Sequence, residues 1–445
     1  MANKYVSATL GGTTVGSLGA RGIATMDAQG VLTMCDRGID MEWMVGADTW
    51  RVVATDAATR QTVTPGAPIV TTRIAGAGGD VVQTTYGVGG QPNQIVCEFE
   101  NAGRDAVSIA VLLRATPGAR LKKFDASNPI LTVDGLEIMS ANRPWQQWVL
   151  AHDELSVRAA VASHATHHGA MLPTTMKAQR NGCVALVWPL PHQTKLRVVF
   201  PLVPGPQSRV NTMAIDGLPT ADAVANGWET QLERGTRVEI DDAHLQRVID
   251  GARASVMLQA FADTPTPDAD LAIALEDWGL EPEALAAWKR LSMRARRTAG
   301  QRERNAVDGW IRVKTHLNAA GVGTASQAAR FLQAMRDTLL AEHTNAIDLF
   351  PGFPSEWLGR SIAVHGAVTT SGPVSFALRW HGGRPALLWD APAGTTLSAS
   401  RLDPKWTVVA DGAGEQLLNE PANELLAMQP APRMGTTINE PGSFL

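Results

Sequence analysis

The sequence predicts a multidomain α+β fold: a large N-terminal antiparallel β-sandwich, a reduced helical middle that forms a partial α/α toroid, and a small C-terminal β-sandwich. Three observations predict this class. Short apolar runs separated by Gly, Asn and Asp turns recur over residues 1–215, as in sandwich proteins. The apolar spacing then follows the 3.6-residue helical period over most of 216–348. A period of two returns after Phe350.

The strands of the N-terminal sandwich follow from these apolar runs. Asn101 to Asp105 has turn composition, so the runs on either side of it are expected to pair as a hairpin. One short helix is expected near 153–161. The expected strands are 49–54, 69–74, 81–85, 95–100, 107–113, 130–133, 184–188 and 196–202.

The helical middle is bounded by local start and stop signals. Asp241 or Asp242 is expected to cap one helix, Gly279 to end another, and Pro282 to open the next. Thr236 to Ile240 is expected to be a short extended link. The expected helices are 220–234, the helix carrying Leu245 to Val256, 268–278, 282–297, 302–319 and 326–343.

The C-terminal part alternates again between apolar and polar residues. Strands are expected at 362–364, 374–380, 385–389, 397–399 and 406–409, with a tight hairpin turn at 381–384. The expected division is a sandwich at 1–215, a helical linker at 216–242, a reduced helical domain at 243–348, a β domain at 349–420 and an extended tail at 421–445.

Composition excludes several classes of function. The 445 residues carry a formal net charge of -4 and no dominant basic tract, so we expect no nucleic-acid partner. No run approaches the ~18 apolar residues of a membrane span, and no apolar signal core follows Lys4. Cys35, Cys97 and Cys183 lie far apart, so free thiols and a cytoplasmic location are expected. The glycine runs lack a following helix, so we expect no nucleotide site and no cofactor. No Cys or acidic residue completes a ligand set around the histidines, so we expect no metal.

Three stretches carry a resemblance to a known group of enzymes. They are the Trp-bearing segment 227–245, the helix pair 274–285 around a Gly turn, and the exit segment 347–357. They and the order of the parts resemble inverting glycoside hydrolases and disaccharide phosphorylases with (α/α) barrels. The resemblance implies a catalytic cup lined by a full ring of helices. The sequence supplies about five helices after the linker helix, too few to close such a cup, and no residue maps onto the general acid or base.

Carboxylates beside aromatic rings are the residue types that bind and cleave sugars. The expected carbohydrate-binding residues are Glu276, Asp277 and Trp278 at a helix end, and Trp188 and His192 at a strand end. The histidine cluster at 164–168 is interpreted as a polar loop, because no acidic or Cys partner completes a ligand set.

Three hypotheses about function follow. The first is a glycoside-hydrolase-like protein with an incomplete barrel that is non-catalytic or binds carbohydrate. The second is an assembly protein that uses the frame and tail for protein–protein contacts. The third is an inverting glycosidase or phosphorylase whose cleft is completed in a homo-oligomer.

Overall fold

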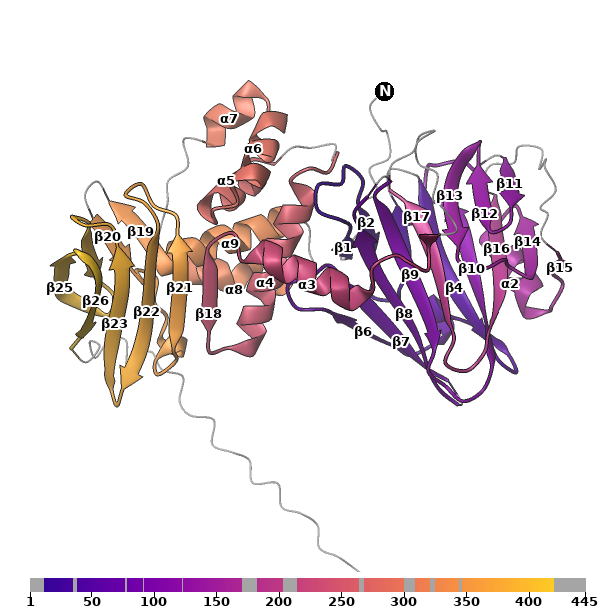
Figure 1. Ribbon diagram of the computed structural model, residues 1–445, viewed down its shortest axis with the longest axis horizontal. Coiled ribbons are helices and arrows are strands. Elements are labelled where there is room, and N and C mark those ends of the chain that lie inside the picture. The colour runs from indigo at the N-terminus through magenta and orange to yellow at the C-terminus, as the bar shows by residue number, and fades with distance from the viewer. Residues whose placement is uncertain are drawn as a thin grey trace, which may run out of the picture.

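The computed structural model describes residues 12–34, 38–76, 78–90, 92–121, 123–169, 182–202, 214–263, 268–299, 309–320, 325–343 and 346–419. It has the predicted mixed α+β class, with helices in the middle of the chain between two β units (Figure 1). Among the described residues, no helix combines the length and hydrophobicity that a transmembrane span requires.

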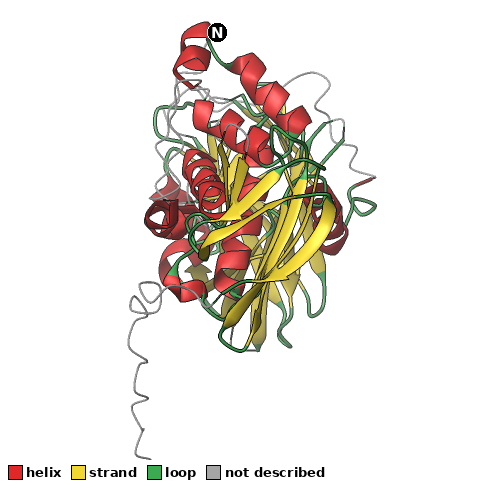
Figure 2. Cartoon of the chain, turned by 90° about the vertical axis from the view of Figure 1, so that its left-hand side faces the viewer, coloured by secondary structure: helices red, strands yellow, loops and turns green. Residues whose placement is uncertain are grey.

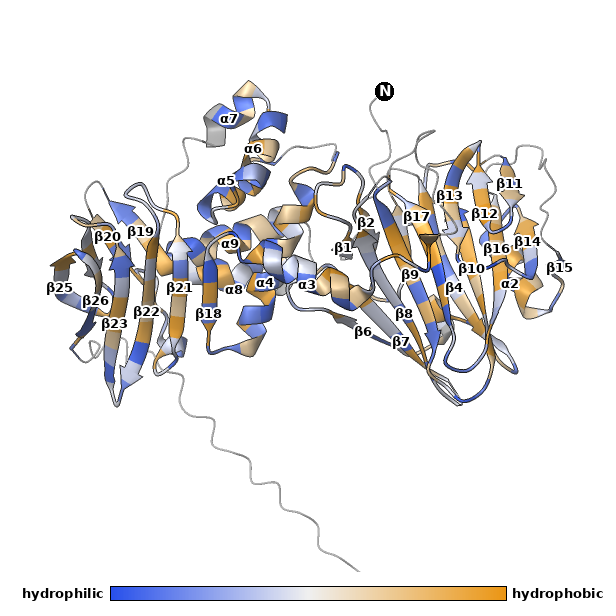
Figure 3. Ribbon diagram, in the orientation of Figure 1, coloured by the Kyte–Doolittle hydropathy of each residue, from blue (hydrophilic) through white to orange (hydrophobic). Residues whose placement is uncertain are grey.

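The N-terminal unit is a sandwich of two antiparallel sheets, and hydrophobic residues (orange in Figure 3) mark its strands. Its core lies between the sheets, where Trp43 and Phe99 meet edge to face with ring centroids 5.3 Å apart. Within the described residues, one sheet contains β1 (Thr13–Val15), β2 (Ala24–Met26), β3 (Leu32–Met34), β4 (Ile39–Gly46), β5 (Trp50–Val52), β10 (Val107–Ala115), β14 (Gln147–Ala151), β15 (His167–His168) and β16 (Cys183–Leu190). The other contains β6 (Thr59–Val63), β7 (Val70–Gly76), β8 (Gly79–Val88), β9 (Gln94–Asn101), β11 (Phe124–Ser127), β12 (Ile130–Val133), β13 (Leu136–Ala141) and β17 (Lys195–Pro201).

Two short helices accompany this sandwich. Helix α1 (Val53–Asp56) follows β5, and α2 (Glu154–Ala162) begins after Asp153, whose side chain accepts from the Ser156 amide. Val157 and Val161 of α2 pack on the nine-stranded sheet with residues of β4, β10 and β16. The predicted helix near 153–161 is therefore confirmed.

The hairpin predicted around Asn101 to Asp105 is wrong. β9 pairs with β8 and β17 in one sheet, whereas β10 pairs with β4 and β16 in the other. The turn instead crosses between the sheets, and Asn101 fixes it by donating to the Leu190 and Asp105 carbonyls. Turn composition predicts that the chain reverses, but not which strands become neighbours.

The helical middle begins as predicted and departs from prediction in two places. Asp242 caps α4, and Gly279 (φ +69°) follows α5. The single helix expected over 282–297 is broken, because Leu291 is extended and the Ser292 side chain caps a new helix by accepting from Ala295. The last helix ends at Leu339 rather than near 343, and residues 302–308 lie outside the described chain. The helices are α3 (Ala221–Leu232), α4 (Ala243–Gln259), α5 (Ala269–Asp277), α6 (Glu281–Arg290), α7 (Met293–Ala299), α8 (Gly309–Ala320) and α9 (Ala325–Leu339).

Helix α9 is the central element of this helical unit. Every residue from Phe331 to Leu339 is buried, and the helix packs against α4, α5, α8 and strand β19 (Leu340–His343). A helix buried all round has no face left to line an open cup. The described helices therefore form a filled bundle rather than a ring.

The C-terminal unit is built from two further sheets, and Figure 2, seen from this end, shows its strands in front with helices beside and behind them. Strands β22 (Val374–His381) and β23 (Arg384–Ala391) form the predicted tight hairpin, with His381 opposite Arg384. Residues 421–445 of the predicted tail lie outside the described chain. The larger sheet holds β18 (Arg237–Ile240), β21 (Ile362–Ala367), β22 (Val374–His381), β23 (Arg384–Ala391) and β26 (Gly412–Leu417). The smaller holds β19, β20 (Ala346–Leu349), β24 (Thr396–Ala399) and β25 (Asp403–Val409), and the 3-10 helix η3 (Ser355–Trp357) follows β20.

Strand β18 lies where the sequence predicted only an extended link. The segment expected as a free extended link pairs antiparallel with β21 and so becomes an edge strand of the C-terminal sheet (Figure 1). Val238 and Ile240 are buried in the core that joins the helices to this sheet. The linker segment is therefore part of the C-terminal sheet, although its partner strand lies more than a hundred residues later in the sequence.

Candidate functional site

A depression of about 380 Å³ opens where the linker meets the C-terminal sheet. We call it the β18–β21 depression. It lies within the size range of small-molecule sites, roughly 300–1,000 Å³. Its lining comes from three segments of the chain: Glu233, Arg234, Gly235, Thr236, Arg237, Gly279, His365, Gly366 and Val368.

Backbone hydrogen bonds hold these segments together. The Thr236 amide donates to the Trp278 carbonyl at 2.9 Å, and its hydroxyl donates to the Gly366 carbonyl at 3.3 Å. A Cβ at Gly235 would come within 2.5 Å of the Trp278 carbonyl oxygen, so the close approach there requires glycine. These contacts fix three stretches of main chain at the depression: the segment before β18, the end of α5 and the end of β21.

The walls carry charged groups of both signs. Arg234 donates to Glu283 at 2.6 Å, and Glu283 is only 2% exposed although it is ionisable. Glu283 stands in the first turn of α6, where the helix dipole favours a negative charge. Its second carboxylate oxygen is buried and has no hydrogen-bond partner among the described residues.

A second pair of charges lies on the strands themselves. Glu239 Oε1 is 3.0 Å from an Arg237 nitrogen and 3.5 Å from His365 Nε2. Arg237 and His365 are direct cross-strand partners on β18 and β21, which places their side chains on one face of the sheet. The depression therefore offers hydrogen-bond donors and acceptors close together.

A buried arginine lies behind this wall. Arg253 of α4 donates to the Leu232 carbonyl at the end of α3, and its guanidinium lies 5.7 Å from the Trp278 ring. Burial lowers the pKa of Arg253 to about 10. The contact joins α3, α4 and the end of α5.

Three of the predicted carbohydrate-binding residues lie at the end of α5, and none of them lines the depression. Trp278 is buried, and its indole N–H donates to the Leu332 carbonyl at 3.0 Å, so the ring is a core anchor between α5 and α9. Glu276 is exposed and accepts a hydrogen bond from the Trp288 indole at 3.1 Å. Asp277 is half-buried. Only the next residue, Gly279, lines the depression itself.

The other two predicted residues lie in the N-terminal sandwich. Trp188 is buried on β16, donates to the Arg143 carbonyl at 3.0 Å and packs edge to face on Trp145. His192 is exposed in the turn after β16, with Nδ1 against the Gly103 carbonyl. The structure does not bring the predicted residues together into one site.

A raised pKa is the property of a general acid, and among the described residues burial gives it to Asp250 on α4 and to two carboxyl groups of the N-terminal sandwich. Burial raises the pKa of Asp40 and of Glu42 on β4, in spite of nearby arginines. Glu42 pairs with Arg158 of α2, which covers it, and Asp40 lies 3.5 Å from Arg114. These groups anchor α2 on the sheet.

The histidine cluster is a loop only in part, because His167 and His168 form strand β15, which pairs with β14. His167 stacks on Trp148 with ring centroids 4.6 Å apart. Within the described part of the chain, no group of three or more His, Cys, Asp or Glu side chains is placed to hold a metal ion.

Sequence reasoning missed the residues of the depression. Arg234, Arg237, Glu283 and His365 are spread over more than 130 positions and form no local motif. The available signal was the short Arg-Gly-Thr-Arg turn at 234–237, where charges flank a glycine just before a strand-like run.

Comparison with solved structures gives a weak structural likeness. No family model and no curated protein matches the sequence. Among solved structures, the chain is similar to a GH92 alpha-mannosidase from Bacteroides thetaiotaomicron, with a TM-score of 0.36 and 10% sequence identity. The similarity covers 58% of this chain and 41% of that protein, so this chain spans less than half of its length.

Proposed function

We propose that this protein is a non-catalytic, glycoside-hydrolase-like protein that acts by binding carbohydrate. The observation that carries the proposal is the position of α9, which fills the middle of the described helical unit. Inverting hydrolysis needs a carboxylic acid and a carboxylate about 6.5–9.5 Å apart, with a sugar and a water between them. A filled bundle leaves no such space at its centre.

Three buried polar side chains of α9 support the same conclusion, because each of them holds a neighbouring element. Gln333 donates to the Asp270 carbonyl on α5 at 2.6 Å, and Asp337 pairs with Arg312 of α8 at 2.6 Å. Arg336 donates to the Val368 carbonyl at 3.0 Å. These contacts are structural ties, and a catalytic residue would have to be free to meet a substrate.

The test measures turnover and binding side by side. We expect no hydrolysis of aryl α- and β-glycosides, and no phosphorolysis of disaccharides with added phosphate, above the rate without protein. We expect binding to a subset of saccharides on a glycan array. Saturable turnover that a single Glu or Asp substitution abolishes in a folded variant would overturn the non-catalytic part, and an array without any bound glycan would overturn the binding part.

Assembly is the second candidate, and exposed apolar side chains favour it. Leu285 on α6 is 55% exposed and Met293 on α7 is 68% exposed, and these helices stand at the outer edge of the helical unit (Figure 1). Apolar side chains of this size at a protruding edge are typical of contact surfaces. If two copies meet there, L285K with M293K lowers the mass measured by light scattering, whereas V409K at the other end of the molecule leaves it unchanged.

A further inference from the structure

We infer that the β18–β21 depression is the carbohydrate site, and that it holds one sugar ring through Arg234, Arg237 and His365. The inference rests on the proposed binding function and adds its location and ligand class. Neither the sequence motifs nor the comparisons point to these residues.

The depression is a preorganised surface. Thr236 ties the linker to both the α5–α6 turn and the end of β21 through hydrogen bonds from its amide and hydroxyl. Antiparallel pairing fixes Arg237 directly opposite His365. Because the supporting backbone is already ordered, a ligand does not have to order it on binding.

The two arginines that line the depression use only part of their hydrogen-bonding capacity within the described residues. Arg234 and Arg237 each meet a carboxylate of the described residues through a single nitrogen, Nη2, although a guanidinium carries five N–H donors. Glu283 is buried and lies outside the lining, so it positions Arg234 without reaching a ligand. A sugar hydroxyl accepts hydrogen bonds from the guanidinium donors that remain.

The balance of charge favours a neutral ligand. Arg234 and Arg237 are accompanied by Glu233, also in the lining, and by Glu239, which pairs with Arg237. A phosphate would be repelled by the two carboxylates, and an ammonium group by the two guanidiniums. A sugar carries no charge, and each of its hydroxyls both donates and accepts. Exposed Val368 offers the one apolar wall for its C–H groups.

Gly366 provides a way to block the site without removing a charge. Its φ is +64°, and a Cβ built on it meets no atom within 4 Å, so a side chain there would enter open space beside the lining. Asparagine tolerates this backbone region better than other residues. G366N is therefore expected to fold and to obstruct the depression.

The experiment is a saturation-transfer NMR titration of the full chain with methyl glycosides of glucose, galactose and mannose. Inorganic phosphate and glycine serve as anionic and zwitterionic probes. We expect at least one methyl glycoside to bind, R237A and H365A each to weaken it about tenfold, and G366N to abolish it. R379A, an exposed arginine on β22 of the same sheet, is the matched control and should leave binding unchanged. Thermal unfolding checks that each variant is folded.

Each other outcome contradicts a different part of the inference. Sugar binding that survives R237A, H365A and G366N places the sugar elsewhere, which overturns the site and leaves the proposed function standing. Binding of phosphate or glycine that these variants abolish, with no sugar bound, overturns the ligand class. Failure of every glycoside on both the titration and the glycan array overturns the site and the proposed function together.

Discussion

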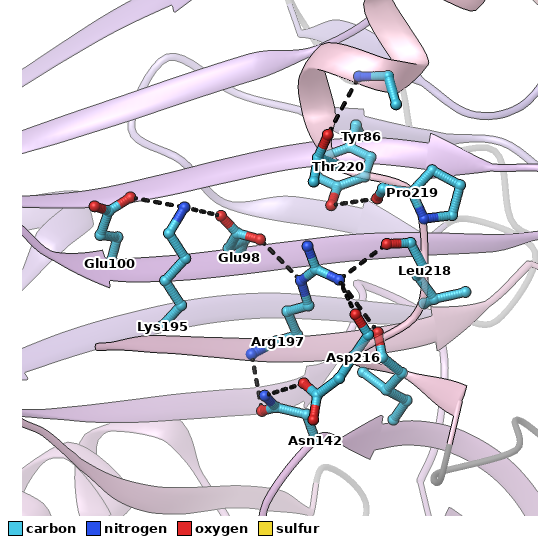
Figure 4. A network of polar contacts seen from close by, with 12 residues as sticks. Tyr86, Glu98, Glu100, Asn142, Lys195, Arg197, Asp216, Leu218, Pro219 and Thr220 are labelled. Atoms are coloured by element: carbon cyan, nitrogen blue, oxygen red, sulfur yellow. Dashed lines mark hydrogen bonds and ion pairs between the residues drawn. The ribbon is translucent and has the colours of Figure 1, made fainter. Parts of the chain in front are cut away.

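Replacing Arg197 with methionine should loosen the junction between the N-terminal sandwich and helix α3. Figure 4 shows that the Arg197 guanidinium reaches the linker, where Nη1 donates to the carbonyls of Ile215, Asp216 and Leu218 at 3.0–3.3 Å. Its Nε also pairs with Glu98 at 2.9 Å. Methionine keeps the aliphatic stem and removes every donor.

The magnitude follows from these contacts. A hydrogen bond from a charged donor contributes about 1.5–3 kcal/mol, but the three carbonyls share one nitrogen and lie near water. We therefore expect a local loss of about 2–3 kcal/mol. In hydrogen exchange by mass spectrometry, that loss corresponds to roughly 30- to 150-fold faster exchange of amides in 214–224 if the segment opens locally.

Lys195 provides the matched control, because it also pairs with Glu98. Its side chain is 52% exposed, whereas that of Arg197 is 11% exposed. An exposed pair contributes about 0–1 kcal/mol, so K195M should change exchange in 214–224 by less than about fivefold. Equal effects of R197M and K195M would refute the assignment of Arg197 as the anchor of the linker.

The remaining predictions concern acid stability and the helical core. Burial raises the pKa of Glu98, but hydrogen bonds from Lys195 and Arg197 outweigh it and hold that pKa below its ordinary value. Glu98 therefore stabilises the fold above about pH 4.3, the pKa of an unfolded glutamate, and this contribution is lost as the pH falls through the lower folded value. E98Q should show a shallower acid limb in thermal unfolding between pH 3 and 5, and an unchanged limb would contradict this. W278A should destabilise the helical unit by about 3–5 kcal/mol in urea unfolding, because it removes a buried indole that joins α5 to α9; a loss below about 1 kcal/mol would show that the ring is not an anchor.

Local signals predicted the elements well, because their chemistry is local. Asp242, Gly279 and the Pro282 start all act within one turn of the helix they bound, and the sequence placed each of them correctly. Ser292 is the missed counterpart: it caps α7 and so divides one expected helix in two. Serine is a common N-cap residue, but the helical spacing of apolar residues continued across Ser292 and so predicted a single helix.

Pairing between distant segments could not be predicted. β10 is apolar at most positions because both of its faces are buried, in the core between the sheets and under α2. β9 is apolar at half of its positions, and neither pattern tells which strands become neighbours. β18 pairs with a strand more than a hundred residues away. The same limit applied to the depression, since its lining is assembled by that pairing.

The cluster at the end of α5 shows what residue type and sequence adjacency can and cannot predict about a site. Glu276, Asp277 and Trp278 were predicted from residue type and adjacency, and none of the three lines the depression. The Trp278 indole points into the core to meet the Leu332 carbonyl, which only the position of α9 determines. Adjacency in the sequence does not predict the direction of the side chains.

The most direct test of the filled helical unit is to enlarge a side chain at its centre. Ala334 on α9 is fully buried, whereas Ser326 on the same helix is partly exposed. A filled core predicts that A334L loses about 1–3 kcal/mol of unfolding free energy in urea through overpacking, and that S326L changes it by less than about 0.5 kcal/mol. A334L as stable as the wild type, or more stable, would reveal unfilled space beside α9 and contradict the account.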